Sequence, residues 1–144
     1  MPDELQVLGR AVKQAQYKQH RALDSRLAAA GTTLAQWDAL RAISRAPGSP
    51  ARALAAATFQ SEQAFGTLAG RLAALGLIDR RPGTGRRIEH HLTPAGEEVL
   101  SAGHRIADEV LAWCYSGLSP TDRTTLLELL HRIDGGADAQ PPPL

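Results

Sequence analysis

The chain has 144 residues, a formal net charge of +1 and only 4% aromatic residues. This length fits one domain with an added dimerisation element, and it is short for a catalytic cleft plus a separate regulatory domain. The single cysteine, Cys114, excludes an internal disulfide and any cysteine-based zinc cluster.

Targeting and membrane signals are not apparent. The N-terminus lacks a basic stretch followed by an apolar one, so we expect no signal peptide. Apolar runs stay well short of the roughly 20 residues that a membrane span needs. We therefore expect a soluble, cytoplasmic protein with no membrane partner.

The first half of the chain has helical periodicity throughout. Apolar spacing and capping residues predict four helices in this half. They are roughly Glu4 to Ala30, Thr33 up to the Pro47-Gly48 stop, a short helix opened by Ser49-Pro50, and Glu62 to Leu75 after the Ser61 cap. The inner face of the fourth helix is expected to hold Phe65, Leu68, Leu72 and Leu75.

A change of period follows the fourth helix. Leu77 to Arg81 suits a short strand, Pro82 to Gly85 is a strong turn signal, and Arg86 to Leu92 alternates like a second strand. Two cap-proline pairs, Thr93-Pro94 and Ser119-Pro120, then open two more helices. The order predicts a mainly α fold with a small β-hairpin wing, a winged helix-turn-helix.

In such a unit the second helix of the pair lies in the major groove of DNA, so Glu62 to Leu75 is the expected recognition helix. Its N-terminus at Ser61 offers amide groups to a phosphate. Gln63 suits adenine, Thr67 a thymine methyl or a phosphate, and Arg71 a phosphate. Gly66 and Gly70 leave two interpretations open, which are crowding against a neighbouring helix and close approach to DNA.

The charge distribution supports a polyanion partner. Between Arg71 and Arg87 lie five arginines and one aspartate, whereas residues 93–134 carry three arginines and seven acids. A basic patch beside an acidic remainder suits a polyanion bound at one place. Four of these arginines bracket the glycine-rich turn, where they would reach the minor groove or phosphates: Arg80, Arg81, Arg86 and Arg87. The alternative is a solvated charged hairpin.

Three segments together resemble the MarR (multiple antibiotic resistance regulator) family. They are Leu34 to Arg41, Arg71 to Arg81, and Leu92 to Gly96, and the resemblance extends from about Leu8 to Ile133. It implies a transcriptional regulator that forms a triangular homodimer on a pseudo-palindromic operator of double-stranded DNA. It also implies a small-molecule effector in a pocket between the dimer base and the DNA-binding lobe.

The resemblance also implies a division of the chain. Residues 1–31 and 94–134 would form the helical dimerisation region and residues 32–93 the DNA-binding domain, with 135–144 as a disordered tail. For the effector pocket we name Tyr17, His20 and Trp37, with core or interface packing as the alternative. Packing is the preferred interpretation for Trp113.

Two departures from the family pattern support a second functional hypothesis. The middle of the recognition helix carries Gly66 and Thr67 in place of a hydroxyl and a basic residue, and the wing lacks the family's Asp-x-Arg aspartate. The alternative is a winged-helix protein-interaction module without specific DNA reading.

Other chemistry has little support in the sequence. No nucleophile elbow, phosphate-binding loop or metal motif is present, so we expect neither an enzyme nor a cofactor or metal. His90 and His91 should point to opposite faces of a strand and cannot chelate one ion together. Cys114 is a redox sensor if its thiolate is stabilised and accessible, and otherwise an inert buried residue.

Overall fold

The computed structural model describes residues 2–135. Helices dominate, and one antiparallel hairpin interrupts them, as expected. The elements are α1 (Pro2–Ala28), α2 (Leu34–Arg45), α3 (Ala51–Ala57), α4 (Glu62–Ala74), β1 (Ile78–Pro82), β2 (Ile88–Leu92), α5 (Pro94–Cys114) and α6 (Pro120–Asp134). Apart from Gly135, the tail predicted for residues 135–144 lies outside the described residues.

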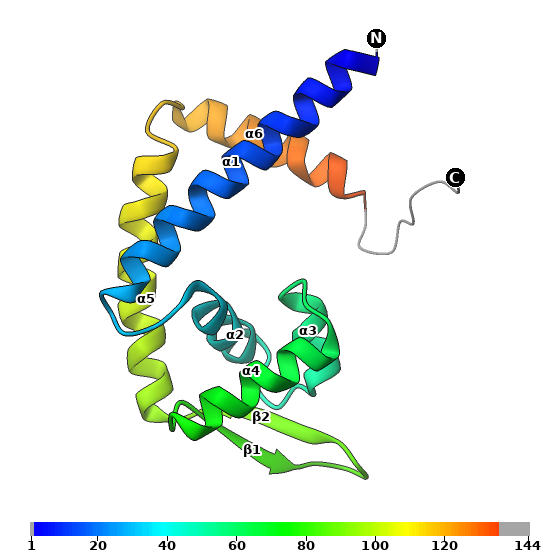
Figure 1. Ribbon diagram of the computed structural model, residues 1–144, viewed down its shortest axis with the longest axis vertical. Coiled ribbons are helices and arrows are strands. Elements are labelled where there is room, and N and C mark those ends of the chain that lie inside the picture. Colours follow the sequence, from blue (N-terminus) through cyan, green and yellow to red (C-terminus); the bar gives the residue numbers. More distant parts are fainter. Residues whose placement is uncertain (1, 136–144) are drawn as a thin grey trace.

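The elements separate into a lobe, formed by α2, α3, α4 and the hairpin, and an arch, formed by α1 and α6. Figure 1 shows α2, α3, α4 and the hairpin gathered at one end of the molecule, while α1 and α6 cross at the other. Helix α5 runs between the two ends and packs against both α1 and α2. This arrangement connects the wing directly to the helices of the arch.

Helix starts follow the predicted caps at most positions. The side chains of Thr33, Ser61, Thr93 and Ser119 each accept a hydrogen bond from a backbone N–H of the first turn. The exception is α3, where Pro50 is the N-cap and makes no side-chain capping bond. Ser49, the predicted cap, instead donates its hydroxyl to the Ala46 carbonyl at 2.7 Å.

The core is centred on α2. Leu40 and Ile43 of α2 are almost fully buried, together with Leu27, Leu54, Phe65 and Leu72 from the surrounding helices. The prediction for Leu75 was wrong, because this residue is 55% exposed, and Ala69 occupies the buried position instead. At 3.6 residues per turn, Leu75 lies about 80° around the helix from Phe65 and leaves the core-facing stripe.

Two glycines of α5 let the helix approach the lobe. A Cβ at Gly96 would lie 2.0 Å from the Leu77 carbonyl oxygen, and one at Gly103 would lie 2.2 Å from the Trp37 ring. Both distances are far below van der Waals contact, so only glycine fits. The wing base and α2 are therefore packed tightly against α5.

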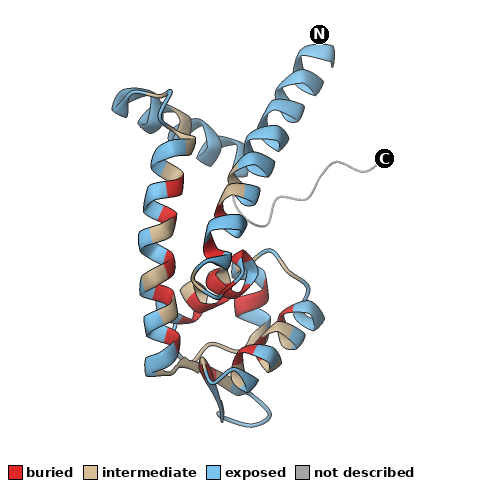
Figure 2. Ribbon diagram, turned by 60° about the vertical axis from the view of Figure 1, so that its left-hand side comes forward, coloured by how far each residue is buried: buried red, intermediate tan, exposed pale blue. Residues whose placement is uncertain are grey.

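The arch carries unburied apolar side chains. Helix α6 has no buried residue, and Figure 2 shows the first half of α1 and most of α6 exposed. Large apolar residues with high exposure lie on both helices, namely Leu5, Val7, Leu8, Val12, Leu127, Leu129, Leu130 and Ile133. A groove of about 360 Å³ between α5 and α6 is lined mainly by leucines.

Candidate nucleic-acid interface and adjoining cavity

Helix α4 presents a polar face to solvent. Gln63, Thr67 and Arg71 are exposed at successive turns of this face. The Ser61 hydroxyl oxygen accepts from the Ala64 amide at 3.1 Å, which defines the start of the helix. The Thr67 hydroxyl donates to the Gln63 carbonyl at 3.2 Å, so its proton is engaged within the helix and its oxygen remains an acceptor.

The two glycines of α4 have different surroundings. A Cβ at Gly66 would meet nothing within 4 Å, which excludes crowding by a neighbouring helix at this position within residues 2–135. Gly70 lies beneath the Arg80 guanidinium, whose Nη2 is 3.5 Å from the point that a Cβ would occupy. Gly66 therefore leaves the helix surface open, and Gly70 seats an arginine from the wing.

The hairpin register assigns the wing side chains to two faces. Ile78 pairs with Leu92, and Arg80 with His90, so these four side chains share the face that turns toward α4 and the core. His90 is buried there, stacks edge-on against Phe65 at 6.0 Å, and donates its Nδ1–H to the Ser49 carbonyl at 2.9 Å.

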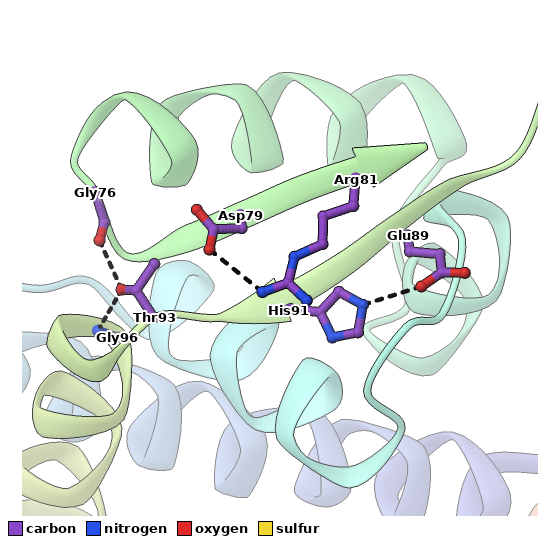
Figure 3. A network of polar contacts seen from close by, with 7 residues as sticks. All are labelled: Gly76, Asp79, Arg81, Glu89, His91, Thr93 and Gly96. Carbon is purple, nitrogen blue, oxygen red and sulfur yellow. Dashed lines mark hydrogen bonds and ion pairs between the residues drawn. The ribbon is translucent and has the colours of Figure 1, made fainter. Parts of the chain in front are cut away.

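The other face of the hairpin is solvated and charged. Figure 3 shows Asp79, Arg81, Glu89 and His91 on this face. Arg81 forms an ion pair with Asp79 at 3.5 Å, and His91 contacts Glu89 at 3.0 Å. The two adjacent histidines thus point to opposite faces, as the alternation predicted.

Four of the five predicted arginines carry no ion pair. Within residues 2–135, Arg81 is paired, while Arg71, Arg80, Arg86 and Arg87 have no carboxylate within 4 Å. Strand β2 begins at Ile88 rather than at the predicted Arg86, so Arg86 and Arg87 belong to the turn. In that turn the Gly83 amide donates to the Arg87 carbonyl at 2.7 Å. Of the unpaired arginines, Arg71 lies on α4 and Arg80 over Gly70 of that helix, whereas Arg86 and Arg87 are exposed in the turn.

Thr93 connects the wing to α5. Its hydroxyl donates to the Gly76 carbonyl at 2.6 Å and accepts from the Gly96 amide at 3.1 Å (Figure 3). Its own amide donates to the Leu77 carbonyl at 3.1 Å. One residue therefore links the end of α4, the start of β1 and the first turn of α5.

A cavity of about 360 Å³ lies where α1, α2 and α5 meet. His20 and Trp37, both predicted for an effector pocket, line it, whereas Tyr17 is 59% exposed and does not. The lining also includes residues that the sequence interpretation did not single out: Gln16, Gln19, Leu23, Leu34, Asp38, Arg41, Phe59, His104, Ala107, Asp108 and Leu111.

Arg41 is the principal cation of this cavity. Its guanidinium lies over the Trp37 ring, with Cζ 4.4 Å from the ring centroid, and its Nε is buried without a hydrogen-bond partner among residues 2–135. The Asp38 Oδ1 lies 3.5 Å from the Arg41 Nη1. Burial raises the pKa of Asp38 despite the opposing effect of that guanidinium. The spacing of Trp37 and Arg41, four residues apart on one helix, was a signal available in the sequence.

Metal ligands do not cluster in the described part of the chain. Residues 2–135 contain no group of three or more histidine, cysteine, aspartate or glutamate side chains placed to hold a metal ion. Cys114 is a partly buried free thiol at the end of α5. None of the described helices is both long and apolar enough to span a membrane.

Comparisons with known proteins identify related folds. Residues 30–88 match the model of the MarR family. A protein of Pseudomonas aeruginosa, described as a probable transcriptional regulator, is similar with 29% identity and a TM-score of 0.78 over 87% of this chain and 95% of its own. No curated protein matches.

Two further solved structures share the fold. A mutant of MarR from E. coli, complexed with operator DNA, is 22% identical with a TM-score of 0.84, covering 91% of this chain and 96% of that one. A MarR-family protein of Mycobacterium tuberculosis, complexed with salicylic acid, is 21% identical with a TM-score of 0.72, covering 88% and 95%.

Proposed function

We propose that this chain is a homodimeric transcriptional regulator of the MarR family that binds operator DNA and responds to a small aromatic acid. One observation carries the DNA-binding part. Arg71 on the exposed face of α4, Arg80 over Gly70 of the same helix, and Arg86 and Arg87 in the turn of the hairpin are exposed arginines with no acidic partner in the described chain.

DNA recognition follows from this surface. Helix α4 enters the major groove with Ser61 and its free amides toward a phosphate, while Gln63 and Thr67 face the bases. The open surface at Gly66 lets the helix backbone approach the groove closely. Arg71 and the wing arginines neutralise phosphates or enter the minor groove, and Arg81 joins them because its exposed pair with Asp79 is weak.

The unburied apolar faces of α1 and α6 support the dimer. Contiguous exposed apolar surface of this kind marks an interaction site in soluble proteins. A second copy would cover these faces and set the distance between two α4 helices, which must match half-sites about 34–36 Å apart. Residues 1–31 and 94–134 then form the dimerisation region, and 32–93 form the DNA-binding domain.

The cavity between α1, α2 and α5 is the proposed effector site. It lies between the arch and the lobe, and it combines the Trp37 ring with the Arg41 guanidinium, whose buried Nε has no partner. That combination suits a planar aromatic carboxylate, and the Mycobacterium tuberculosis relative is described with salicylic acid. A ligand that favours one lobe spacing shifts the population away from the DNA-binding form.

The test is operator binding at two salt concentrations. Fluorescence anisotropy would follow a labelled duplex from the region upstream of the coding sequence, with excess random DNA as competitor. We expect saturable, competitor-resistant binding that weakens steeply with salt. Replacing Arg86 and Arg87 by alanine should weaken binding and flatten the salt slope by about one unit for each phosphate that an arginine no longer neutralises.

Arg105→Ala is the matched control, because Arg105 is an exposed arginine on α5 away from the wing. It should leave the salt slope unchanged. Unchanged operator affinity in the double arginine variant would contradict the role of the wing.

A protein-interaction module remains the second candidate. Gly66 and Thr67 favour it, since one lacks a side chain and the other donates its hydroxyl to its own helix. Absence of DNA binding even at low salt would support this candidate over the regulator.

A further inference from the structure

Phe59, in the turn between α3 and α4, has an unusual conformation. Its φ is +57°, and it is the one non-glycine residue with positive φ among residues 2–135. A bulky side chain is strained in this region of backbone conformation, where glycine is the usual residue. The residue is also 98% exposed, so the ring buries almost no surface within the described chain to offset this strain.

The surroundings of the ring suggest why this residue is present. Phe59 lines the cavity between α1, α2 and α5, and it also lines a second cavity of about 360 Å³ between α2 and α3. Asp38 and Arg41 are the other residues common to both cavities. The ring therefore stands at the boundary of the proposed effector site, beside the cation that would hold a carboxylate.

The backbone of Phe59 leads directly to the recognition helix. Ser61, which caps α4, is two residues farther along the chain. The turn is held firmly to α3, since the Gln60 amide donates to the Ala55 carbonyl at 2.9 Å and the Thr58 hydroxyl to the Leu54 carbonyl at 2.8 Å. Because the turn is short and bonded to α3, a displacement of Phe59 would move α3 and the start of α4 together.

We infer that Phe59 couples the effector site to DNA binding: its ring stacks on a bound aromatic acid held by Arg41, and its turn moves the N-terminus of α4. This inference rests on the proposed function and assigns the regulation of the same cavity to one residue. Stacking gives the exposed ring a partner only when ligand is present, so the turn has a ligand-dependent position.

Full-length Phe59→Ala and Phe59→Tyr variants test the inference with salicylate as the probe. Calorimetry would measure salicylate affinity without DNA, and anisotropy would measure operator affinity with and without saturating salicylate. We expect Phe59→Ala to lose about 2- to 12-fold in salicylate affinity, the range for one aromatic contact. The effect of salicylate on operator affinity, about 5- to 150-fold in a coupled wild-type protein, should fall below about threefold. Phe59→Tyr keeps the ring and should retain both.

The outcomes separate the inference from the proposed function. If Phe59→Ala binds salicylate and releases operator as the wild type does, the inference is wrong and the regulator stands. If the wild-type protein binds operator but salicylate neither binds nor releases it, the inference and the effector class both fail. If no duplex binds, the proposed function fails, while calorimetry still decides whether Phe59 contacts the ligand.

Discussion

At the scale of single residues, the pKa of Asp38 reflects two opposing effects, which are its burial and the positive charges nearby. Burial penalises the charged carboxylate and raises its pKa. The Arg41 guanidinium lowers the pKa by a smaller amount, so the net shift is upward. The side chains of Asp38 and Arg41 are 44% and 31% exposed, and their 3.5 Å contact is long, so the ion pair stabilises little. The charged carboxylate therefore costs stability at neutral pH.

Asp38→Asn should raise the melting temperature at pH 7. The folded protein holds this proton more tightly than the unfolded chain, so the cost is full above the folded-state pKa and disappears as the pH falls toward the ordinary value of 3.8. The gain over the wild type should shrink between pH 7 and pH 4, as thermal unfolding at both values would show. A lower melting temperature of the variant at pH 7 would contradict this account.

Several site residues could be predicted from the sequence because their position depends on local periodicity. His20 and Trp37 line the cavity between α1, α2 and α5, although Trp37 is also a buried core residue, and the opposite faces of His90 and His91 follow from strand alternation. The conformation of Phe59 could not be predicted, because phenylalanine normally avoids positive φ. The ion pair between Arg81 and Asp79 was accessible to the same argument from strand alternation, because residues two apart on one strand lie on the same face.

At the scale of secondary-structure elements, capping chemistry made most helix boundaries predictable. Ser61, Thr93 and Ser119 act as the predicted caps, and prolines follow the last two at the first helical position. The close approach of α5 to α2 was not predictable, because the role of Gly103 depends on Trp37, which lies far away in the sequence.

A pair of glycine-to-alanine variants separates packing from helix propensity. Gly103→Ala should lower the free energy of unfolding by about 1–3 kcal/mol or more, because the new Cβ overlaps the buried Trp37 ring. Gly66→Ala should raise it by about 0.5–1 kcal/mol, because its Cβ meets nothing within 4 Å and alanine favours the helix. Denaturant unfolding monitored by circular dichroism measures both.

The same Gly66→Ala variant addresses the two interpretations of this glycine. If α4 must approach the groove closely, the more stable variant should bind operator more weakly than the wild type. Stability gained with no loss of operator affinity would show that close approach is not required at this position.

At the scale of the whole molecule, the lobe and the arch differ in how much apolar surface they bury. The lobe buries its own core, whereas α6 buries no residue and the first half of α1 is exposed (Figure 2). Since α5 joins the arch to the wing through Thr93 and Gly96, the geometry of the arch determines where each α4 lies. In the proposed dimer, the packing of the two arches would therefore determine both the distance between the two α4 helices on DNA and the response to an effector.

Glutamate on the arch should separate the proposed dimer. Leu8 and Ile133 are 54% and 69% exposed, so Leu8→Glu and Ile133→Glu leave the subunit core intact, but each places a charge in the proposed apolar interface. Light scattering should show the mass of a dimer for the wild type and of a monomer for either variant. Operator affinity should fall about 100-fold or more, because two linked lobes no longer bind together.

Leu75→Glu is the matched control for this measurement, since Leu75 is 55% exposed but lies at the end of α4 rather than on the arch. It should leave the mass at that of a dimer. A wild-type protein with the mass of a monomer would refute the dimer itself. If both arch variants instead keep the dimer mass, the interface lies elsewhere, and the exposed faces of α1 and α6 need a different partner.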